Sequence, residues 1–379
     1  MAGTPSQEGS VANGKNNVLK RIWSETVDHK FNVLKVGKVF KDIFPSMVTG
    51  GEDGILKVHQ CTINEGSKLL SGFETKGHSL ETKSGPIQRI CFENVTNFNS
   101  TDILVGDSKG MLTIFTNNQI LSRRSLIQSS IASITIEKDS AGNMKILLGS
   151  LDGTVLAVSP YSTLWKLRLP DILQEKCQGA ITSFEITSIL NQHLVSGSTD
   201  ATYTVVADNK CCLHFFQSGT LVRTLKLPSV ALCMCSGYFI PMDPILTPVP
   251  TTPMLTSTPG FSSPTRKTRL QGRMDDQIAV GTADGKILIV SGPNIVQYGN
   301  IGTRITNIHV VRGAYDGSDL LICSGHFNFL SILQDGKELT RYKTVDWIHT
   351  FDILIHEDSN KYIVIGCLDS KIEILKLDF

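Results

Sequence analysis

One pattern of apolar and polar positions recurs along the chain. Two or three apolar residues are followed by Gly, two residues, Asp-Gly and then a segment in which apolar and polar residues tend to alternate. The clearest copies are MVTGGEDGILKVH from Met47, ILLGSLDGTVLAV from Ile146 and IAVGTADGKILIV from Ile278. The apolar run predicts one strand, the Asp-Gly step predicts a tight turn with a positive φ at Gly, and the alternating segment predicts a partner strand. Each copy therefore predicts a β-hairpin.

Four less regular copies extend the series, so that seven glycines mark equivalent positions. These copies are ILVGDSKGMLTIF from Ile103, LVSGSTDATYTVV from Leu194, LICSGHFNFLSIL from Leu321 and IVIGCLDSKIEIL from Ile363. The turn residues expected to have structural roles are Gly50, Asp53, Gly106, Gly149, Asp152, Gly197, Asp200, Gly281, Asp284, Gly325, Gly366 and Asp369. Successive glycines are 56, 43, 48, 84, 44 and 41 residues apart, and a four-stranded propeller blade takes about 40–45 residues. The spacing predicts an all-β fold with a single seven-bladed β-propeller over residues 17–379.

The two ends of the predicted ring complement each other. The sequence ends at Phe379, directly after the strand that follows the seventh turn, so the seventh blade would lack its outermost strand. The stretch from Asn17 to Trp23 has strand-like apolar content and precedes the first repeat. We predict that this N-terminal strand closes the ring, which would remove exposed sheet edges. Residues 1–16, small and polar, are expected to be a disordered tail.

The long gap between the fourth and fifth glycines contains a proline-rich insertion. Seven of the 14 prolines lie within residues 241–273, and proline cannot continue a central strand. We expect a long disordered loop rich in Pro, Ser and Thr. Its Ser/Thr-Pro pairs predict regulatory phosphorylation at Thr247, Thr252, Thr258 and Ser263, although the same pairs would also occur in a spacer of this composition.

Composition and charge narrow the classes of function. The formal net charge is +1, from 36 basic and 35 acidic residues, so no electrostatic footprint indicates nucleic-acid binding. The sequence has neither a secretory leader nor an apolar run of about 18 residues, and we therefore expect a cytoplasmic protein without an integral membrane segment. The nine cysteines lack zinc-ligand spacing. They are interpreted as reduced, structural thiols, with no metal and no cofactor.

A search for catalytic signatures finds none. Nucleophile elbows, P-loops and zinc-protease motifs are absent from the sequence. The turn aspartates recur one blade apart, which argues against an acid–base dyad, and His326 occupies a turn position. The strands taken as candidates for the channel wall, ILLGS, IAVGT and IVIGC, are almost wholly apolar. These features predict that the protein is not an enzyme.

The repeats resemble those of two propeller families. FENVTNFNSTDILVGDSKGMLTIF is similar to an FG-GAP repeat, and RGAYDGSDLLICSG from Arg312 resembles it too. Residues Glu93, Asn94, Thr96 and Asn97 replace the acidic calcium positions of such a repeat, so we predict no calcium. The segment from Ile146 to Pro170 resembles a quinoprotein-type repeat, but the Trp165 position is not repeated in every blade. That departure disfavours a quinone enzyme.

The resemblance points to intracellular propellers with degenerate FG-GAP or WD-like repeats. This group includes the integrin-alpha FG-GAP repeat-containing proteins of the KICSTOR complex and, less closely, the propeller subunits of the BBSome. It implies a cytosolic scaffold or adaptor that binds protein partners in a multi-subunit complex, in nutrient and TORC-type signalling at the lysosome. Recruitment to a membrane would then be peripheral and through a partner. The alternatives are a ciliary or vesicle-coat trafficking propeller of the BBSome type and, less favoured, a propeller hydrolase or quinoprotein.

Overall fold

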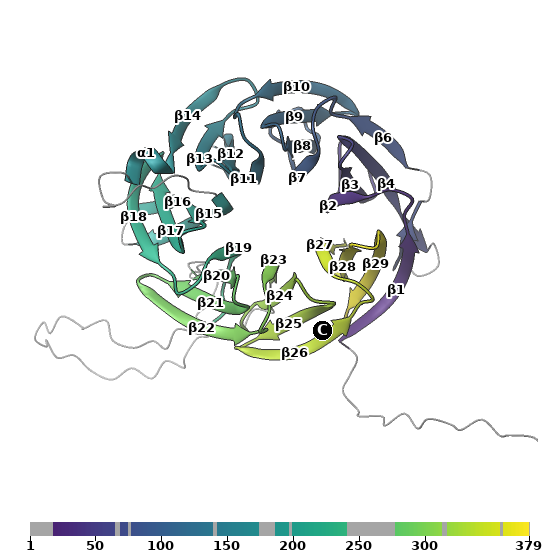
Figure 1. Cartoon of the computed structure of the whole chain (residues 1–379). Helices are drawn as coiled ribbons and strands as arrows, with labels where there is room; N and C mark the ends of the chain where they lie inside the picture. The colour runs from purple at the N-terminus through teal and green to yellow at the C-terminus, as the bar shows by residue number, and fades with distance from the viewer. Residues whose placement is uncertain are drawn as a thin grey trace, which may run out of the picture.

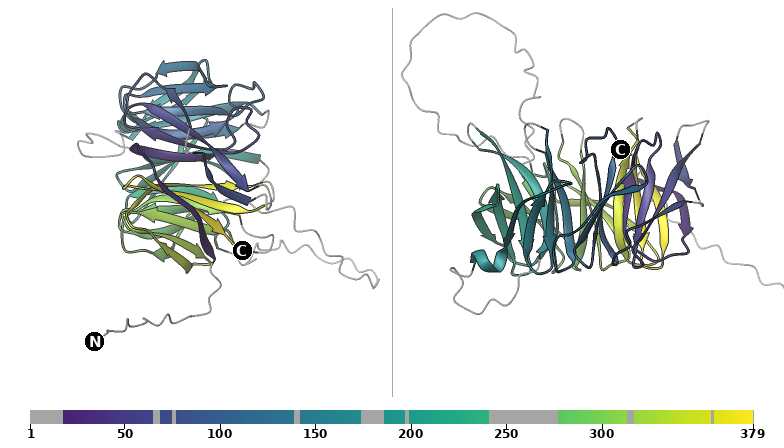
Figure 2. Two further views of the ribbon diagram at one scale, coloured as in Figure 1. Left: turned by 90° about the vertical axis from the view of Figure 1, so that its right-hand side faces the viewer. Right: turned by 90° about the horizontal axis from the view of Figure 1, so that it is seen from above.

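The computed structural model describes residues 18–64, 69–74, 77–138, 142–173, 186–196, 199–240, 277–312, 317–356 and 359–378. Seven antiparallel sheets stand as blades around a central channel (Figure 1). Seen from the side, the strands run between two roughly flat faces (Figure 2). The predicted all-β, seven-bladed propeller is confirmed. The predicted tail, residues 1–16, and the predicted loop, residues 241–273, lie outside the described residues.

Each blade has a strand at the channel, two middle strands and an outer edge. Blade one contains β2 (Phe31–Gly37), β3 (Ser46–Gly51), β4 (Ile55–Asn64) and two short strands that both pair with β4, β5 (Leu69–Phe73) and β6 (His78–Glu81). Blade two contains β7 (Ile87–Glu93), β8 (Asp102–Asp107), β9 (Met111–Thr116) and β10 (Gln119–Ser125). Blade three contains β11 (Ile131–Lys138), β12 (Met144–Ser150), β13 (Thr154–Val158) and β14 (Thr163–Arg168), and a short helix, α1 (Leu169–Leu173), follows it.

The remaining four blades have the same arrangement. Blade four contains β15 (Ile186–Ser196), β16 (Thr199–Asp208), β17 (Cys212–Gln217) and β18 (Thr220–Lys226). Blade five contains β19 (Ala231–Gly237), β20 (Gln277–Thr282), β21 (Lys286–Ser291) and β22 (Asn294–Asn300), so the proline-rich segment joins its first two strands. Blade six contains β23 (Ile305–Val311), β24 (Leu320–Gly325), β25 (Phe329–Gln334) and β26 (Lys337–Lys343). Blade seven contains β27 (Ile348–Ile355), β28 (Lys361–Cys367), β29 (Lys371–Leu377) and β1 (Leu19–Thr26).

The apolar runs of the repeats are second strands, and the sequence-based assignment of ILLGS, IAVGT and IVIGC to the channel wall is wrong. They lie in β12, β20 and β28, one strand away from the channel. Residues of β3, β8, β20 and β24 are buried throughout, because these strands are covered on both sides by neighbouring blades. A strand buried on both faces reads as a continuous apolar run. The strands nearest the channel instead alternate buried and half-buried residues, as β2 and β19 show.

The N-terminal strand closes the ring as predicted. Strand β1 pairs antiparallel with β29, from Leu19 opposite Leu377 to Thr26 opposite Lys371. The indole of Trp23 meets the Phe73 ring of blade one edge-on, with ring centroids 5.5 Å apart. The closing strand therefore supplies the fourth strand of blade seven and also contacts blade one.

The recurring glycines are required by the approach of the next blade. Positive φ angles occur at Gly54, Gly110, Gly153 and Gly285, the second glycines of the pattern. A Cβ atom on Gly50 would lie 2.5 Å from Cγ2 of the buried Ile87, and one on Gly106 would lie 2.7 Å from Cγ2 of Ile131. At Gly50 and Gly106 the absence of a side chain thus leaves room for the channel strand of the following blade.

Candidate functional site

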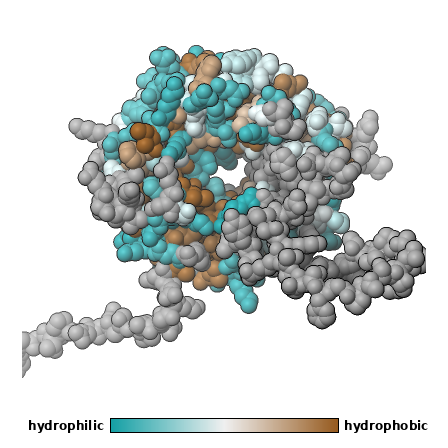
Figure 3. Space-filling model, turned by 180° about the vertical axis from the view of Figure 1, so that it is seen from behind, coloured by the Kyte–Doolittle hydropathy of each residue, from teal (hydrophilic) through white to brown (hydrophobic). Residues whose placement is uncertain are grey.

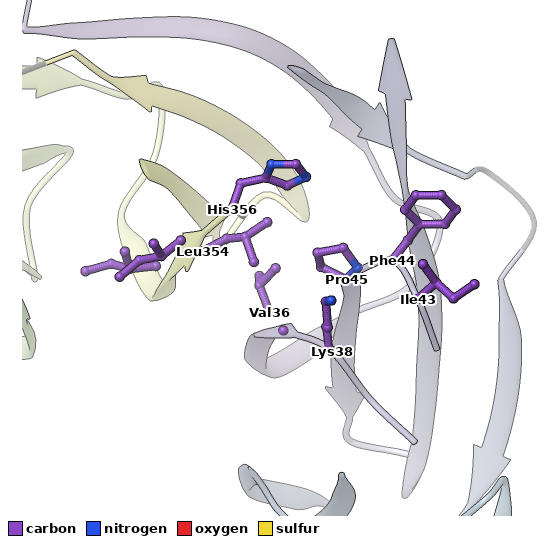
Figure 4. Close-up of a pocket in the computed structure, with 10 residues that line it drawn as sticks. Val36, Lys38, Ile43, Phe44, Pro45, Leu354 and His356 are labelled. Carbon is purple, nitrogen blue, oxygen red and sulfur yellow. The ribbon is translucent and has the colours of Figure 1, made fainter. Parts of the chain in front are cut away.

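An apolar groove lies where blade seven meets blade one. We call it the 7/1 groove; its volume is about 610 Å³, and the strand ends of β2 and β27 form its floor (Figure 4). The connection between β2 and β3 forms one wall. The groove is lined by Val36, Gly37, Lys38, Ile43, Phe44, Pro45, Ile353, Leu354, Ile355 and His356. It opens on the face that carries the connections between first and second strands, and this face shows apolar surface beside the channel mouth (Figure 3).

The 7/1 groove displays apolar side chains on an anchored loop. Ile43 is 77% exposed, Ile355 is 59% exposed and Phe44 is 48% exposed. Hydrogen bonds anchor the loop on both sides of Ile43 and Phe44. On the N-terminal side, the backbone N–H of Phe40 donates to the carbonyl of Thr101 at 2.7 Å. On the C-terminal side, the carbonyl of Pro45 accepts a hydrogen bond from the Cys61 N–H at 2.8 Å. An exposed apolar cluster on a rigid support is typical of a protein interaction site.

Basic and apolar residues extend this surface around the groove. Lys38 and Lys41 are exposed in the same loop. On blade two, Phe98 is 51% exposed in the segment whose Thr101 bridges to Phe40. The surface therefore combines apolar anchors with positive charge, which suits a partner segment with apolar and acidic side chains.

The wall of the central channel carries polar side chains near the seam between blades seven and one. Asp352 accepts a hydrogen bond from Lys35 Nζ at 2.9 Å, and its second carboxylate oxygen accepts from the Val36 N–H at 2.9 Å. His309 Nδ1 lies 4.0 Å from Asp352 Oδ1. Burial raises the pKa of the Cys91 thiol to about 11, and burial lowers the pKa of His309 to about 4. Cys91 therefore remains a thiol at neutral pH, without the thiolate that a nucleophilic cysteine requires.

The turn aspartates hold the turns between second and third strands. Asp53, Asp152 and Asp369 each accept a hydrogen bond from the N–H two residues ahead, at 3.0, 3.0 and 3.1 Å. Asp284 instead accepts from Thr282 Oγ1 at 2.6 Å and from Lys286 Nζ at 2.7 Å. Partial burial opposes its ionisation, but these hydrogen bonds lower the pKa of Asp284 to about 2. The geometry at Asp53, Asp152 and Asp369 corresponds to Asx turns that stabilise the hairpins.

The other predicted glycines lie in second strands: Gly149 in β12, Gly281 in β20, Gly325 in β24 and Gly366 in β28. A Cβ atom on Gly281 would lie 2.6 Å from Cys233 Sγ, and one on Gly366 would lie 2.6 Å from Phe31 Cε2. His326 stacks on Trp347, which lies in the connection between β26 and β27, with ring centroids 5.1 Å apart. The predicted phosphorylation positions Thr247, Thr252, Thr258 and Ser263 lie outside the described residues.

The fourth turn is displaced from its predicted position. Asp200 pairs with Val195 in the ladder between β15 and β16, so it lies at the hairpin between the first and second strands. Gly197 is outside the described residues. Ala207 occupies the position in blade four that the recurring glycines occupy in the other blades, because it pairs with Ser188 of the first strand and Leu213 of the third strand. Asp208 then accepts from the N–H groups of Lys210 and Cys212 at 2.9 and 2.8 Å. The prediction was wrong because Ala207 replaces glycine there, whereas Gly-x-x-Asp occurs ten residues earlier by chance.

The same turn assembles a cluster that the sequence reasoning missed. Donor atoms of Asp208, Cys212 and His214 lie within 4.8 Å of one another. It is the one group of three or more potential metal ligands among the residues that the structure describes. The signal in the sequence is Asp-x3-Cys-x-His, which differs from the paired-cysteine spacing typical of zinc sites.

Comparisons with known proteins support the fold. Neither a protein-family model nor a curated protein matches the sequence. Among solved structures, the chain is similar to BBS1N, crystallised in complex with ARL6DN, with a TM-score of 0.64, 10% identity and coverage of 95% of this chain and 97% of that chain. It is also similar to the WD40 β-propeller domain of Doa1, with a TM-score of 0.63, 12% identity and coverage of 96% and 98%. At these identities the likeness shows a propeller fold alone.

In the part of the chain that the structure describes, no helix is both long enough and apolar enough to cross a bilayer.

Proposed function

We propose that this protein is a non-enzymatic scaffold subunit that binds a partner protein in the 7/1 groove. The observation that carries this proposal is the exposure of Ile43 and Phe44, on the anchored loop, and of Ile355, at the end of β27, around a groove of about 610 Å³. A partner residue buried there would remove apolar surface from water without requiring the loop to become ordered on binding. Lys38 and Lys41 would attract acidic side chains beside the apolar anchors.

The fold neighbours are consistent with this role. The crystal structure of BBS1N in complex with ARL6DN is of a propeller bound to another protein. By analogy, we propose protein partners in a multi-subunit complex. On the strength of the repeat resemblance, we propose that this complex acts in nutrient and TORC-type signalling at the lysosome, with recruitment through a partner. As a second candidate we propose a ciliary or vesicle-coat trafficking subunit of the BBSome type, because BBS1N has the same propeller fold.

Matched surface variants test the groove. Tagged wild-type protein, Phe44→Ser and Ile355→Ser would be compared with Val345→Ser and Leu368→Ser by quantitative affinity purification from cells that express the protein naturally. All four side chains are exposed, so none of the changes should unfold the ring. We expect the amount of a stoichiometric partner recovered with the groove variants to fall about tenfold, as it does when hot-spot residues are truncated. The two control variants, which lie in other connections of blades six and seven, should retain it.

The identity of the captured proteins distinguishes the two candidate settings. Lysosomal nutrient-signalling components would support the first, and BBSome or intraflagellar components would support the second. The same partners at the same abundance with all five proteins would overturn the groove as the docking site. Absence of any stoichiometric partner would overturn the scaffold proposal itself.

A further inference from the structure

The second-to-third-strand turn of blade four brings together three side chains of different chemistry. Asp208 ends β16, while Cys212 and His214 lie on the same side of β17 because they are two residues apart. Their donor atoms all lie within 4.8 Å of one another. The side chains of Asp208 and His214 are 0% and 1% exposed, and Cys212 is half-buried. We propose that Asp208, Cys212 and His214 bind one zinc ion.

The surroundings hold the first two donors in place. Asp208 Oδ1 accepts hydrogen bonds from the N–H groups of Lys210 and Cys212, which leaves Oδ2 directed toward His214 Nε2 at 2.8 Å. The other ring nitrogen, Nδ1, lies 3.1 Å from Thr224 Oγ1. Metal-binding histidines are commonly oriented by such a hydrogen bond at the second nitrogen. In the zinc-bound state Nδ1 carries the proton and donates to Thr224, and Nε2 is free for the metal.

The set of donors selects the metal. A carboxylate, an imidazole and a thiolate are ligands that zinc accepts in tetrahedral sites, whereas magnesium and calcium require oxygen ligands. The Cys212 thiol loses its proton to solvent when zinc binds. One carboxylate and one thiolate then balance the two positive charges of the ion, so no net charge is buried. Three protein ligands leave the fourth position to a water molecule, and Cys212 faces the side that solvent can reach.

The adjacent cysteine is a matched control. Cys211 packs against the apolar core between blades four and five and does not belong to the ligand cluster. Cys211→Ser and Cys212→Ser therefore remove one thiol each from neighbouring positions, and only the second removes a proposed ligand. Thr224→Val keeps all three ligands but removes the oxygen that orients His214.

The test uses the full-length protein, stripped with a chelator, reloaded with zinc and dialysed, followed by metal analysis. We expect one zinc per chain for wild type and Cys211→Ser, and none for Cys212→Ser. Loading with cobalt should produce a sulfur-to-cobalt charge-transfer band that Cys212→Ser alone lacks. Thr224→Val should weaken zinc binding by about 10–100-fold.

Two results would overturn the proposal: no retained zinc in the wild type, or equal zinc in the two serine variants. If circular dichroism shows that Cys212→Ser is unfolded, the zinc affinity of Thr224→Val decides the matter. If Thr224→Val binds zinc as tightly as the wild type, the zinc is held elsewhere. The cluster is then only a hydrogen-bonded brace of blade four.

Discussion

The distance between blades determines which residue type fits at certain positions of this propeller as much as turn geometry does. The recurring glycine predicts a hairpin, and it lies beside one. Its position in the strand, however, brings it against the channel strand of the next blade, as Gly50 against Ile87 shows. A repeat period in sequence identifies such a residue without revealing this contact, because the partner lies in a different repeat.

Replacing Gly50 with Ala should destabilise the protein by about 1–3 kcal/mol, the usual cost of overpacking a core. The new Cβ would lie 2.5 Å from Ile87 Cγ2 and 3.0 Å from Ile87 Cβ, and Ile87 is fully buried. Chemical denaturation measures the change. The reverse substitution in blade four, Ala207→Gly, is the control and should cost no more than about 1 kcal/mol. Equal stability of Gly50→Ala and wild type would contradict the packing account.

A second prediction at this scale concerns His309. Burial lowers the pKa of His309 to about 4, from 6.5 in the unfolded chain. Between these values the unfolded chain binds a proton that the folded ring does not, so stability falls as the pH is lowered from about 6.5 to about 4. The slope of the free energy of unfolding against pH should be smaller in His309→Asn than in wild type across this window. Unchanged slopes would show that His309 titrates normally in the ring.

At the scale of elements, the closing strand makes the strand pairing with the largest separation in sequence among the residues that the structure describes. Strand β1 joins β29 across almost the whole sequence, and its attachment includes more than backbone pairing. Glu373, only 2% exposed, contacts Arg21 at 3.6 Å and Lys371 at 2.8 Å and accepts from the Tyr342 hydroxyl at 2.8 Å. The apolar content of residues 17–23 and the missing outer strand were enough to predict this pairing, because each predicted sheet edge needs a partner.

A chain that begins at Val27 should unfold at a lower temperature than the full chain, since blade seven would lose its edge strand and the Trp23–Phe73 contact. A synthetic peptide of residues 17–28, added to the shortened chain, should restore stability, and above its dissociation constant the gain should rise with the logarithm of its concentration. The same peptide with Trp23→Ala should restore less, because the contact with blade one is lost. Thermal melts across a peptide titration measure both effects, and equal restoration by the two peptides would exclude a role for Trp23.

At the scale of the whole molecule, the sequence was sufficient for the architecture and insufficient for the surfaces. Seven repeats and their period predicted the seven blades. The strand nearest the channel was misassigned, since the most apolar runs are those buried between blades, such as β12 and β20. The 7/1 groove could not be predicted, because Phe44 and Ile355 are more than 300 residues apart and meet only after ring closure.

Ring closure should therefore control the groove. Strand β27, which carries Ile353 and Ile355, belongs to the blade that β1 completes, and the Lys35–Asp352 pair joins that blade to β2. In the chain that begins at Val27, amide hydrogen exchange should accelerate most in β27, β28, β29 and β2. Blades three and four, on the far side of the ring (Figure 1), should keep exchange rates close to those of the full chain, because local opening follows local contacts. The peptide of residues 17–28 should reverse the change. An equal acceleration in all seven blades would instead show that the ring opens as one cooperative unit, and the groove would then have no special dependence on the closing strand.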